Sequence, residues 1–188
     1  MAEGVELEFT EKTKRIGIMI AIMAAVLALS EAAGQNAQSD ALKGTVELSN
    51  TWAFYQAKTI RKTTLETDAR LLEIQAMSLE PGAQVDAMHK TIEEWRATAA
   101  RYESEPDKQE GRKELAERAA KIEAERDHNA AVNATFDLTS AALQIGILLA
   151  STAVVTNILA FAYAGGAAGL IGVILAAFAL WAPTVFGG

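Results

Sequence analysis

The feature that most constrains this chain is a long segment without charge. From Leu138 to Gly188 the sequence contains no Asp, Glu, Lys or Arg. A helix of a soluble domain needs a face that water can wet, so such a segment is typical of a membrane region. It is long enough to cross a bilayer about twice at roughly 20 residues per pass. We therefore predict transmembrane helices at 138–164 and 166–182, joined near the uncharged run AYAGGAAG and followed by a short C-terminal tail, 183–188.

A second apolar run lies near the N-terminus. Residues 16–33 are interrupted only by Glu31, and at about 1.5 Å per residue they nearly span a hydrocarbon core of roughly 30 Å. The run also resembles the core of a secretory signal, with small residues at Ala28 and Ser30. The preceding run MAEGVELEFTE is unusually acidic for a signal peptide. We expect a retained anchor, preceded by a short polar tail, 1–15.

The basic residues indicate an orientation. Lys12, Lys14 and Arg15 stand directly before the first span, whereas the nearest base on its other side is Lys43. The positive-inside bias then predicts a multi-pass protein of the cell (inner) membrane with a cytoplasmic N-terminus. Residues 34–137 would lie on the periplasmic, extracytoplasmic side.

The middle region is rich in helix-forming residues. Pro81-Gly82 and the run SEPD before Lys108 divide it, which predicts helices at about 35–79, 84–103 and 109–137. Apolar residues of the second helix follow 3,4 spacing, which is typical of a packed seam: Val85, Met88, Ile92, Trp95, Ala99 and Tyr102. The predicted fold is therefore all-α, with three transmembrane helices and an extramembrane helical hairpin or coiled-coil-like stalk between the first and second spans.

The third helix shows no clear stop before the membrane. Leu115, Ala119 and Ile122 follow the same 3,4 spacing, and Arg126 and Asn129 then occupy seam positions. Polar residues in a seam cost stability but can fix register or partner number. We predict one long helix that begins in water and continues into the second span.

Composition argues against several classes of function. The net charge of −7, with acids and bases interspersed, disfavours nucleic acid as a partner. The absence of cysteine excludes disulfides, thiolate metal sites and cysteine nucleophiles. No nucleotide-binding or nucleophile motif is present, and His89 with Glu93 lacks a third ligand. We expect no catalytic residue, cofactor, metal or small-molecule substrate.

The run LSNTWAFYQAKTIRKTTLE combines aromatic and basic residues. On a helix its aromatics spread around several faces, which does not make a flat stacking platform for nucleic acid. A helix that is apolar on several sides is usually buried on several sides, by its hairpin partner or by neighbouring subunits. The packing or partner-contact candidates here are Trp52, Phe54, Tyr55, Gln56, Lys58, Arg61 and Lys62.

Within the charge-free segment, polar and small residues mark candidate helix contacts. Polar side chains in lipid normally face another helix, and small residues let helices approach closely. The candidates are Ser140, Gln144, Ser151, Asn157, Gly165, Gly169, Gly172 and Ala176. A second interpretation is that Ser140, Gln144 and Ser151 line a water-filled path.

These features together resemble a known family. An apolar span is followed by EAAGQNAQSDAL, then by a W-x-x-Y-Q-A-K run at Trp52 to Lys58, then by a charged helical middle and an apolar C-terminal pair. The chain thereby resembles the bacterial membrane proteins of domain of unknown function 4337. That resemblance implies no activity, substrate or functional residue.

Three functions fit the sequence. The first is a non-enzymatic structural, scaffold or accessory subunit in the lipid bilayer, which forms a homo-oligomer or joins a larger membrane complex. The second is an oligomeric channel or transport component lined by the polar face of the second span. The third is a membrane-tethered recognition module that uses the aromatic and basic run.

Overall fold

The computed structural model describes residues 2–181, with side chains from residue 11 onward, and consists of four α-helices. They are α1 (Ala2–Met77), α2 (Ala83–Glu103), α3 (Arg112–Thr156) and α4 (Leu159–Trp181). None of residues 2–181 forms a strand, so the fold is all-α. The predicted tail 183–188 lies outside the described residues.

The chain divides into two compact units, which we describe separately. One, the hairpin unit, is Lys43–Glu125. The other, the apolar bundle, contains Met1–Leu42 and Arg126–Gly188. The helices α1 and α3 each contribute to both units.

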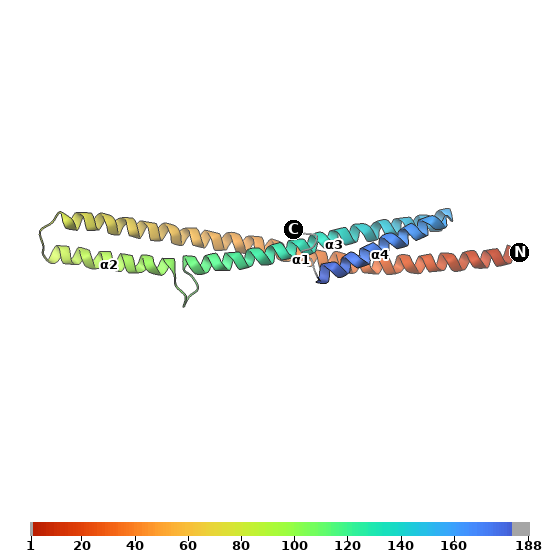
Figure 1. Cartoon of the computed structure of the whole chain (residues 1–188), viewed down its shortest axis with the longest axis horizontal. Coiled ribbons are helices and arrows are strands. Elements are labelled where there is room, and N and C mark those ends of the chain that lie inside the picture. The colour runs from red at the N-terminus through yellow and green to blue at the C-terminus, as the bar shows by residue number, and fades with distance from the viewer. Residues whose placement is uncertain (1, 182–188) are drawn as a thin grey trace. The chain divides into compact units, whose positions relative to one another are not determined.

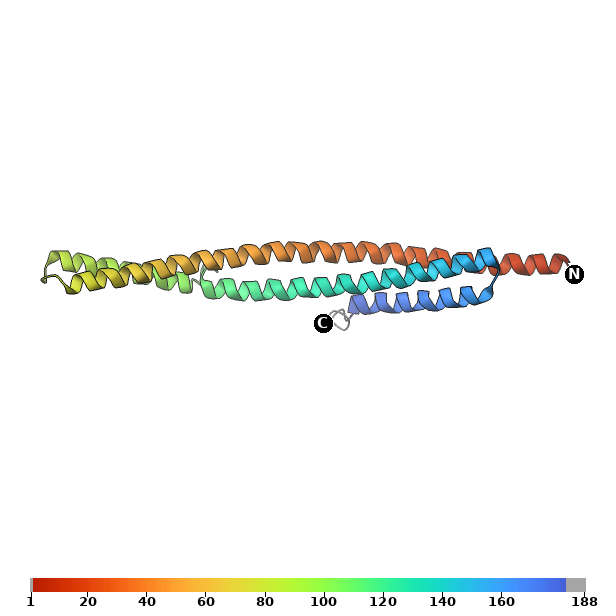
Figure 2. The ribbon, with the colours of Figure 1, turned by 90° about the horizontal axis from the view of Figure 1, so that it is seen from above.

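The hairpin unit pairs α1 with α2 and then with the start of α3 (Figures 1 and 2). α1 ends at Met77 and α2 begins at Ala83, on either side of the Pro81-Gly82 break. The two helices run antiparallel, because Glu73 of α1 contacts Arg96 of α2 at 2.6 Å, whereas Lys62, earlier in α1, contacts Glu103, later in α2, at 3.0 Å. Buried and half-buried residues of α1 in this unit follow 3,4 spacing: Leu48, Thr51, Tyr55, Lys58, Lys62, Leu65, Ala69, Leu72 and Ala76.

α2 presents the seam that its sequence predicts. Ile92 and Ala99 are buried, at 2% and 3% exposure, and the other four seam residues are half-buried. Further along the hairpin, Leu48 of α1 packs against Ala119 and Ile122 of α3. α1 therefore uses one face throughout this unit, first against α3 and then against α2.

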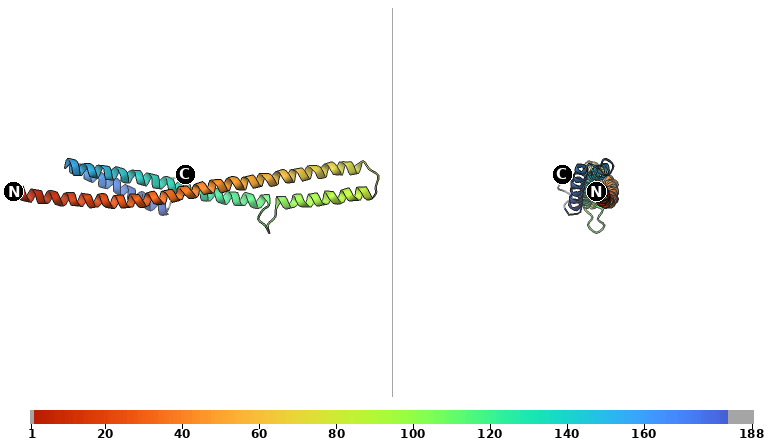
Figure 3. Two further views of the ribbon diagram at one scale, coloured as in Figure 1. Left: turned by 180° about the vertical axis from the view of Figure 1, so that it is seen from behind. Right: turned by 90° about the vertical axis from the view of Figure 1, so that its right-hand side faces the viewer.

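A loop at 104–111 separates α2 from α3 and projects from the hairpin (Figure 3). Glu114, in the first turn of α3, closes it by accepting hydrogen bonds from the Ser104 hydroxyl at 2.6 Å and the Glu105 amide at 3.2 Å. These bonds hold the pKa of Glu114 below its usual range. Gly111 is required there, because a Cβ would lie 2.6 Å from the Cα of Ser104.

Three of the four helices, α1, α3 and α4, are long and apolar enough to cross a membrane by length and composition. Met23, Leu143 and Ala150 form the core of the apolar bundle. α4 packs closely on α3, since a Cβ on Gly146 would lie 2.9 Å from the carbonyl oxygen of Gly165. Small residues therefore line the contact between α3 and α4, and these two helices approach each other through them.

The outer positions of the bundle are large and apolar. Ile22 and Leu29 on α1 are 59% and 72% exposed, Leu148 on α3 is 66% exposed, and Leu170 on α4 is 62% exposed. This is the reverse of a water-soluble helical bundle, where large apolar residues face inward.

The helix boundaries differ from the sequence prediction between the second and third spans and at the N-terminus. The predicted helix 138–164 ends earlier, at Thr156, and α4 begins at Leu159 rather than at 166. Asn157 adopts a positive φ of 60°, a conformation that Asn tolerates and that ends the helix. The run AYAGGAAG is helical because its glycines serve close packing instead of a turn. The polar tail 1–15 is also helical from Ala2 onward, as part of α1.

Candidate functional site

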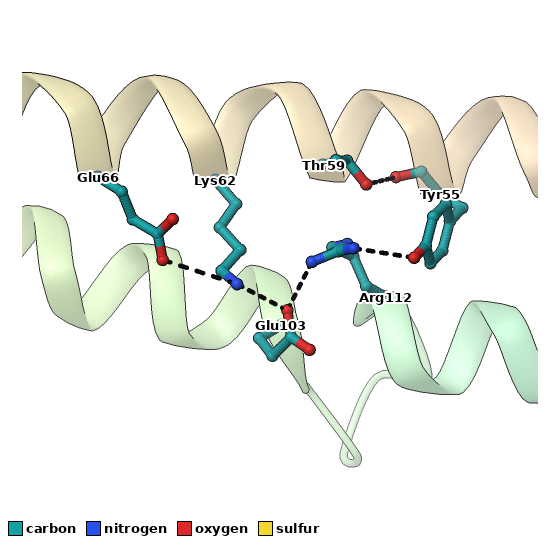
Figure 4. A network of polar contacts seen from close by, with 6 residues as sticks. All are labelled: Tyr55, Thr59, Lys62, Glu66, Glu103 and Arg112. Carbon is teal, nitrogen blue, oxygen red and sulfur yellow. Dashed lines mark hydrogen bonds and ion pairs between the residues drawn. The ribbon is translucent and has the colours of Figure 1, made fainter.

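The most organised group of polar side chains lies where α2 ends and α3 begins, facing α1 (Figure 4). We call Tyr55, Lys58, Lys62, Glu103 and Arg112 the charge cluster. Three of them stand on the seam face of α1, where the 3,4 spacing would otherwise place apolar residues.

Glu103, at the end of α2, links two cations. It accepts a hydrogen bond from Lys62 Nζ at 3.0 Å and another from Arg112 Nη1 at 2.8 Å. Arg112 Nη2 donates to the Tyr55 hydroxyl at 2.8 Å. Lys62 also approaches Glu66, one turn further along α1, at 3.6 Å. Figure 4 shows these contacts as a chain that joins all three helices.

Protonation states in the cluster follow from these contacts. The hydrogen bond to Glu103 raises the pKa of Lys62, and the same bond lowers the pKa of Glu103, with burial opposing both shifts. Tyr55 and Glu103 raise the pKa of Arg112. All three pKa values therefore move away from neutrality. General acid–base catalysis needs a pKa near the working pH, so the cluster is better suited to joining helices than to proton transfer.

Lys58 is the most enclosed of the basic residues in the sequence-predicted run. Its side chain is 13% exposed, lies 5.1 Å from the centre of the Tyr102 ring and approaches Glu110 at 3.8 Å. The basic run was predicted to be a packing or partner surface. Lys58 and Lys62 contact their own chain, whereas Arg61 is exposed.

The aromatic residues divide between the seam and the surface. The rings of Trp52 and Tyr55 meet edge to face, with centres 5.3 Å apart. Tyr55 is half-buried, but Trp52 and Phe54 are 40% and 65% exposed. Gln56 is also exposed. The hairpin therefore covers one side of this segment and leaves Phe54 uncovered.

A second polar feature is a groove of about 340 Å³ in the apolar bundle, between α1 and α3. Gln144 donates a hydrogen bond to Glu31 across it at 3.3 Å, and Asn133 donates to Asp137 at 3.3 Å. Ser140 also lines the groove. The structure thus brings together two of the three residues of the predicted polar stripe, while Ser151 does not line it.

The predicted small-residue contacts lie mainly on the inner face of α4. Gly165, Gly169 and Gly172 are buried, and Ala176 is half-buried. A Cβ on Gly169 would clash with the side-chain sulfur of Met23, on α1. These glycines therefore allow α4 to contact both other helices of the bundle.

The other sequence-predicted positions have more local roles. Arg126 and Asn129 are half-buried on α3, and Arg126 bonds the neighbouring Asp127 at 2.7 Å. Asn157 was predicted to lie inside the second span and to contact another transmembrane helix. It is instead exposed in the turn between α3 and α4. Its place in the turn follows from the earlier end of α3.

The family comparison covers nearly the whole chain. A family model described as Domain of unknown function (DUF4337) matches residues 12–182. The chain belongs to this family. No curated protein and no solved structure was found to match it.

In this DUF4337 chain, sequence reasoning missed four charged residues of the two sites. They are Glu103 and Arg112 in the charge cluster, and Glu31 and Asp137 at the groove. A signal for the cluster was present: the 3,4 spacing from Leu48 through Ala69 passes through Lys58 and Lys62, which predicts that both face a partner helix. For the groove, the signal was the placement of isolated carboxylates at the edges of apolar runs.

The arrangement offers little to a metal ion. Within the part of the chain that the structure describes, no group of three or more His, Cys, Asp or Glu side chains is placed to hold one. The groove presents the carboxylates of Glu31 and Asp137 with amide side chains. The sites of this DUF4337 protein thus consist of paired charges and hydrogen-bonded polar groups.

Proposed function

We propose that this DUF4337 chain is an integral membrane protein with a non-enzymatic structural or accessory role. In this proposal the three apolar helices lie in the bacterial inner membrane, with the N-terminus in the cytoplasm. The hairpin unit is a stalk on the periplasmic side, and it joins a second copy or a larger membrane complex.

The main support for the membrane placement is that the apolar bundle exposes large apolar residues on its outside. Small residues such as Gly165 and Gly169 face inward, while residues such as Ile22, Leu148 and Leu170 face outward at about 60% exposure. Lipid covers such a surface without cost, and small inner residues permit the close packing that holds membrane helices together. Water would be a poor solvent for the same surface.

The charge cluster supports a structural role. Its charges are paired within the chain, and the shifted pKa values of Lys62 and Glu103 keep both ionised over a wide range around neutrality. Such a cluster fixes the register of α1 against α2 and α3, because a one-residue slip would separate the partners.

The experiment is extraction and sizing. After an alkaline wash, we expect the chain to stay in the membrane pellet. After extraction in a mild detergent, we expect it to migrate as a complex larger than its 20.0 kDa monomer. A chain that leaves the membrane in the wash, or that is a monomer without any stable partner, contradicts the proposal.

A second candidate is a channel or transport component, which the polar groove favours. Gln144 and Ser140 line this groove with Glu31, at the side of α3 that faces α1. If an oligomer conducts ions or solutes through this region, Gln144→Leu should change the flux into liposomes that contain the purified protein. Absence of any flux in a confirmed oligomer contradicts it.

The recognition-module alternative depends on which of its residues remain accessible. Lys58, Lys62 and Tyr55 are engaged within the hairpin, which leaves Trp52, Phe54 and Arg61 to meet a partner. Trp52→Ala distinguishes the cases. Loss of a partner with an intact hairpin supports recognition, whereas unfolding of the hairpin indicates a packing role.

A further inference from the structure

The hairpin unit leaves one face of α1 uncovered, opposite the buried seam. Residues on this face again follow 3,4 spacing, so they form a second continuous stripe along the helix. We call them the outer stripe: Val46, Asn50, Ala53, Ala57, Ile60, Thr64, Thr67, Leu71 and Ile74, all exposed. At about 1.5 Å per residue the stripe extends roughly 42 Å, or four heptads.

The outer stripe contains no charged residue, although this part of α1 carries many. Its largest side chains are strongly exposed: Val46 at 62%, Ile60 at 67%, Leu71 at 59% and Ile74 at 61%. The charged residues of the same segment all lie at other helical positions. An uncharged apolar stripe of this length in a water-exposed helix is typical of a helix that pairs with another helix.

The other two helices of the hairpin provide an internal comparison. The positions opposite the seam of α2 include Lys90, Glu94 and Arg101, and those of α3 include Glu117 and Lys121. These outer faces therefore have the composition of a solvated surface. Among the three helices of this unit, only α1 has an outer stripe without charge over four heptads, from residue 46 to residue 74; Lys43 precedes it on the same face.

The residues beside the stripe indicate what can cover it. Suppose that a second copy of α1 lies parallel and in register. The residue just before position 57, 64 or 71 of one copy then lies opposite the residue five positions later in the other copy. Gln56 then faces Arg61 of the other copy, Thr63 faces Asp68, and Arg70 faces Gln75. In these three pairs each charged side chain meets a neutral hydrogen-bonding group, and no like charges are opposed. The stripe is thus electrostatically compatible with itself.

Two further features favour a parallel arrangement. Asn50 occupies a core position of the stripe, and Asn at such a position specifies parallel two-stranded pairing and register. Two copies anchored in one membrane with the same orientation also present α1 in the same direction. Phe54, beside the stripe and 65% exposed, would be covered in this arrangement.

We propose that the outer stripe of α1 is a homodimer interface, on which a second copy of this chain packs parallel and in register. The inference rests on the proposed membrane-anchored structural role and deepens it by naming the partner and the surface.

The chain contains no cysteine, so single cysteines report proximity directly. The test uses Ala53→Cys and Ala57→Cys on the stripe, with Ala97→Cys on α2 and Ala124→Cys on α3 as matched controls. All four alanines are exposed and lie on outer helix faces. The full chain is oxidised in native membranes, and reducible dimers are measured on gels.

The expected result is efficient dimer formation at residues 53 and 57, at least about tenfold above that at residues 97 and 124. Equal yields at all four positions indicate random collision and overturn the proposal. So does dimer formation at residues 97 or 124 without any at the stripe. An antiparallel pair that overlaps along the stripe is recognised by dimers between Ala53→Cys and Leu71→Cys chains without dimers at residue 53 alone, and this result overturns the parallel arrangement.

A disruptive variant provides a second measurement. In the Ala53→Cys background, Ile60→Glu places a carboxylate in the stripe, whereas Ala97→Glu adds the same charge to α2. Both sites are exposed, so the hairpin should fold in each case. We expect Ile60→Glu to reduce dimer yield about tenfold or more and Ala97→Glu to leave it unchanged, because two unpaired carboxylates would be buried against each other. An unchanged yield in Ile60→Glu overturns the interface.

A lysine-reactive crosslinker on the same membranes separates failure of this interface from failure of the proposed function. Complexes captured by that reagent, without cysteine dimers at the stripe, overturn only the interface. If neither reagent captures a complex, both proposals fail.

Discussion

The pairing of Lys62 with Glu103 should contribute measurably to hairpin stability, in contrast to a more exposed pair in the same hairpin. The perturbation is a double-mutant cycle with Lys62→Met, Glu103→Gln and both together. The control is the same kind of cycle on Arg96 and Glu73, which form a 2.6 Å ion pair at the surface.

The magnitude follows from distance and exposure. At 3.0 Å and an effective dielectric constant of about 20, two unit charges attract by about 5.5 kcal/mol before desolvation. Net hydrogen bonds to charged groups are worth about 1.5–3 kcal/mol, and solvent reduces this value for side chains that are 23% and 34% exposed. We expect a coupling energy of about 1–2 kcal/mol for Lys62–Glu103. For the control pair, whose arginine is 56% exposed, we expect about 0.5 kcal/mol or less.

The assay is urea unfolding of the full chain in mild detergent, followed by tryptophan fluorescence. Trp52 and Trp95 both lie in the hairpin unit, and Trp181→Phe in every variant restricts the signal to them. Equal coupling in the two cycles, or coupling near zero for Lys62–Glu103, would refute the reasoning that the charge cluster joins the helices.

Three other predictions concern acid unfolding, the close contact between α3 and α4, and the turn at Asn157. Hydrogen bonds lower the pKa of Glu103 and Glu114, so the contribution of these carboxylates to stability is complete above the ordinary pKa of 4.5 and is lost as pH falls through the lowered pKa values. In acid unfolding followed by fluorescence, the loss of stability with falling pH should therefore be less steep in Glu103→Gln than in the parent. Gly146→Ala should destabilise the bundle by about 1–3 kcal/mol in detergent denaturation, because its Cβ would lie 2.9 Å from a carbonyl oxygen of α4. The control Gly17→Ala, whose Cβ would have nothing within 4 Å, should not destabilise it. Equal effects of the two substitutions would contradict the close contact. Asn157→Gly should have the same melting temperature as the parent. Asn157→Val should have a lower one, by the equivalent of about 1–2 kcal/mol, because a β-branched residue resists a φ of 60°. Similar melting temperatures for the two variants would contradict this account of the turn.

The features that sequence predicts well depend on local pattern. The Pro81-Gly82 break, the seam of α2 from Val85 to Tyr102 and the uninterrupted α3 all follow from helix breakers and 3,4 spacing. Each is determined by residues within a few turns of one another. The three apolar helices follow from composition alone.

The features that it missed depend on which helices meet. The run AYAGGAAG, which contains Gly165 and Gly169, was predicted to hold the connection between the second and third spans, but it is helical and the turn falls at Asn157 instead. The 3,4 spacing places Lys58 and Lys62 toward a partner helix, but it does not show that Glu103, at the end of α2, lies opposite Lys62. The charge cluster could be predicted only by aligning α1 with the junction of α2 and α3.

The membrane placement of the apolar bundle can be tested most directly by cysteine accessibility in the otherwise cysteine-free chain. Single cysteines at Ile22, Leu148 and Leu170, all on outward faces of the bundle, are compared with Ala97→Cys on the hairpin. Membranes opened by sonication are treated with a membrane-impermeant maleimide, so both water-facing sides are reachable. We predict that Ala97→Cys reacts at once, and that the other three react only after detergent is added. Reaction of all four at similar rates in intact bilayers would contradict the membrane placement.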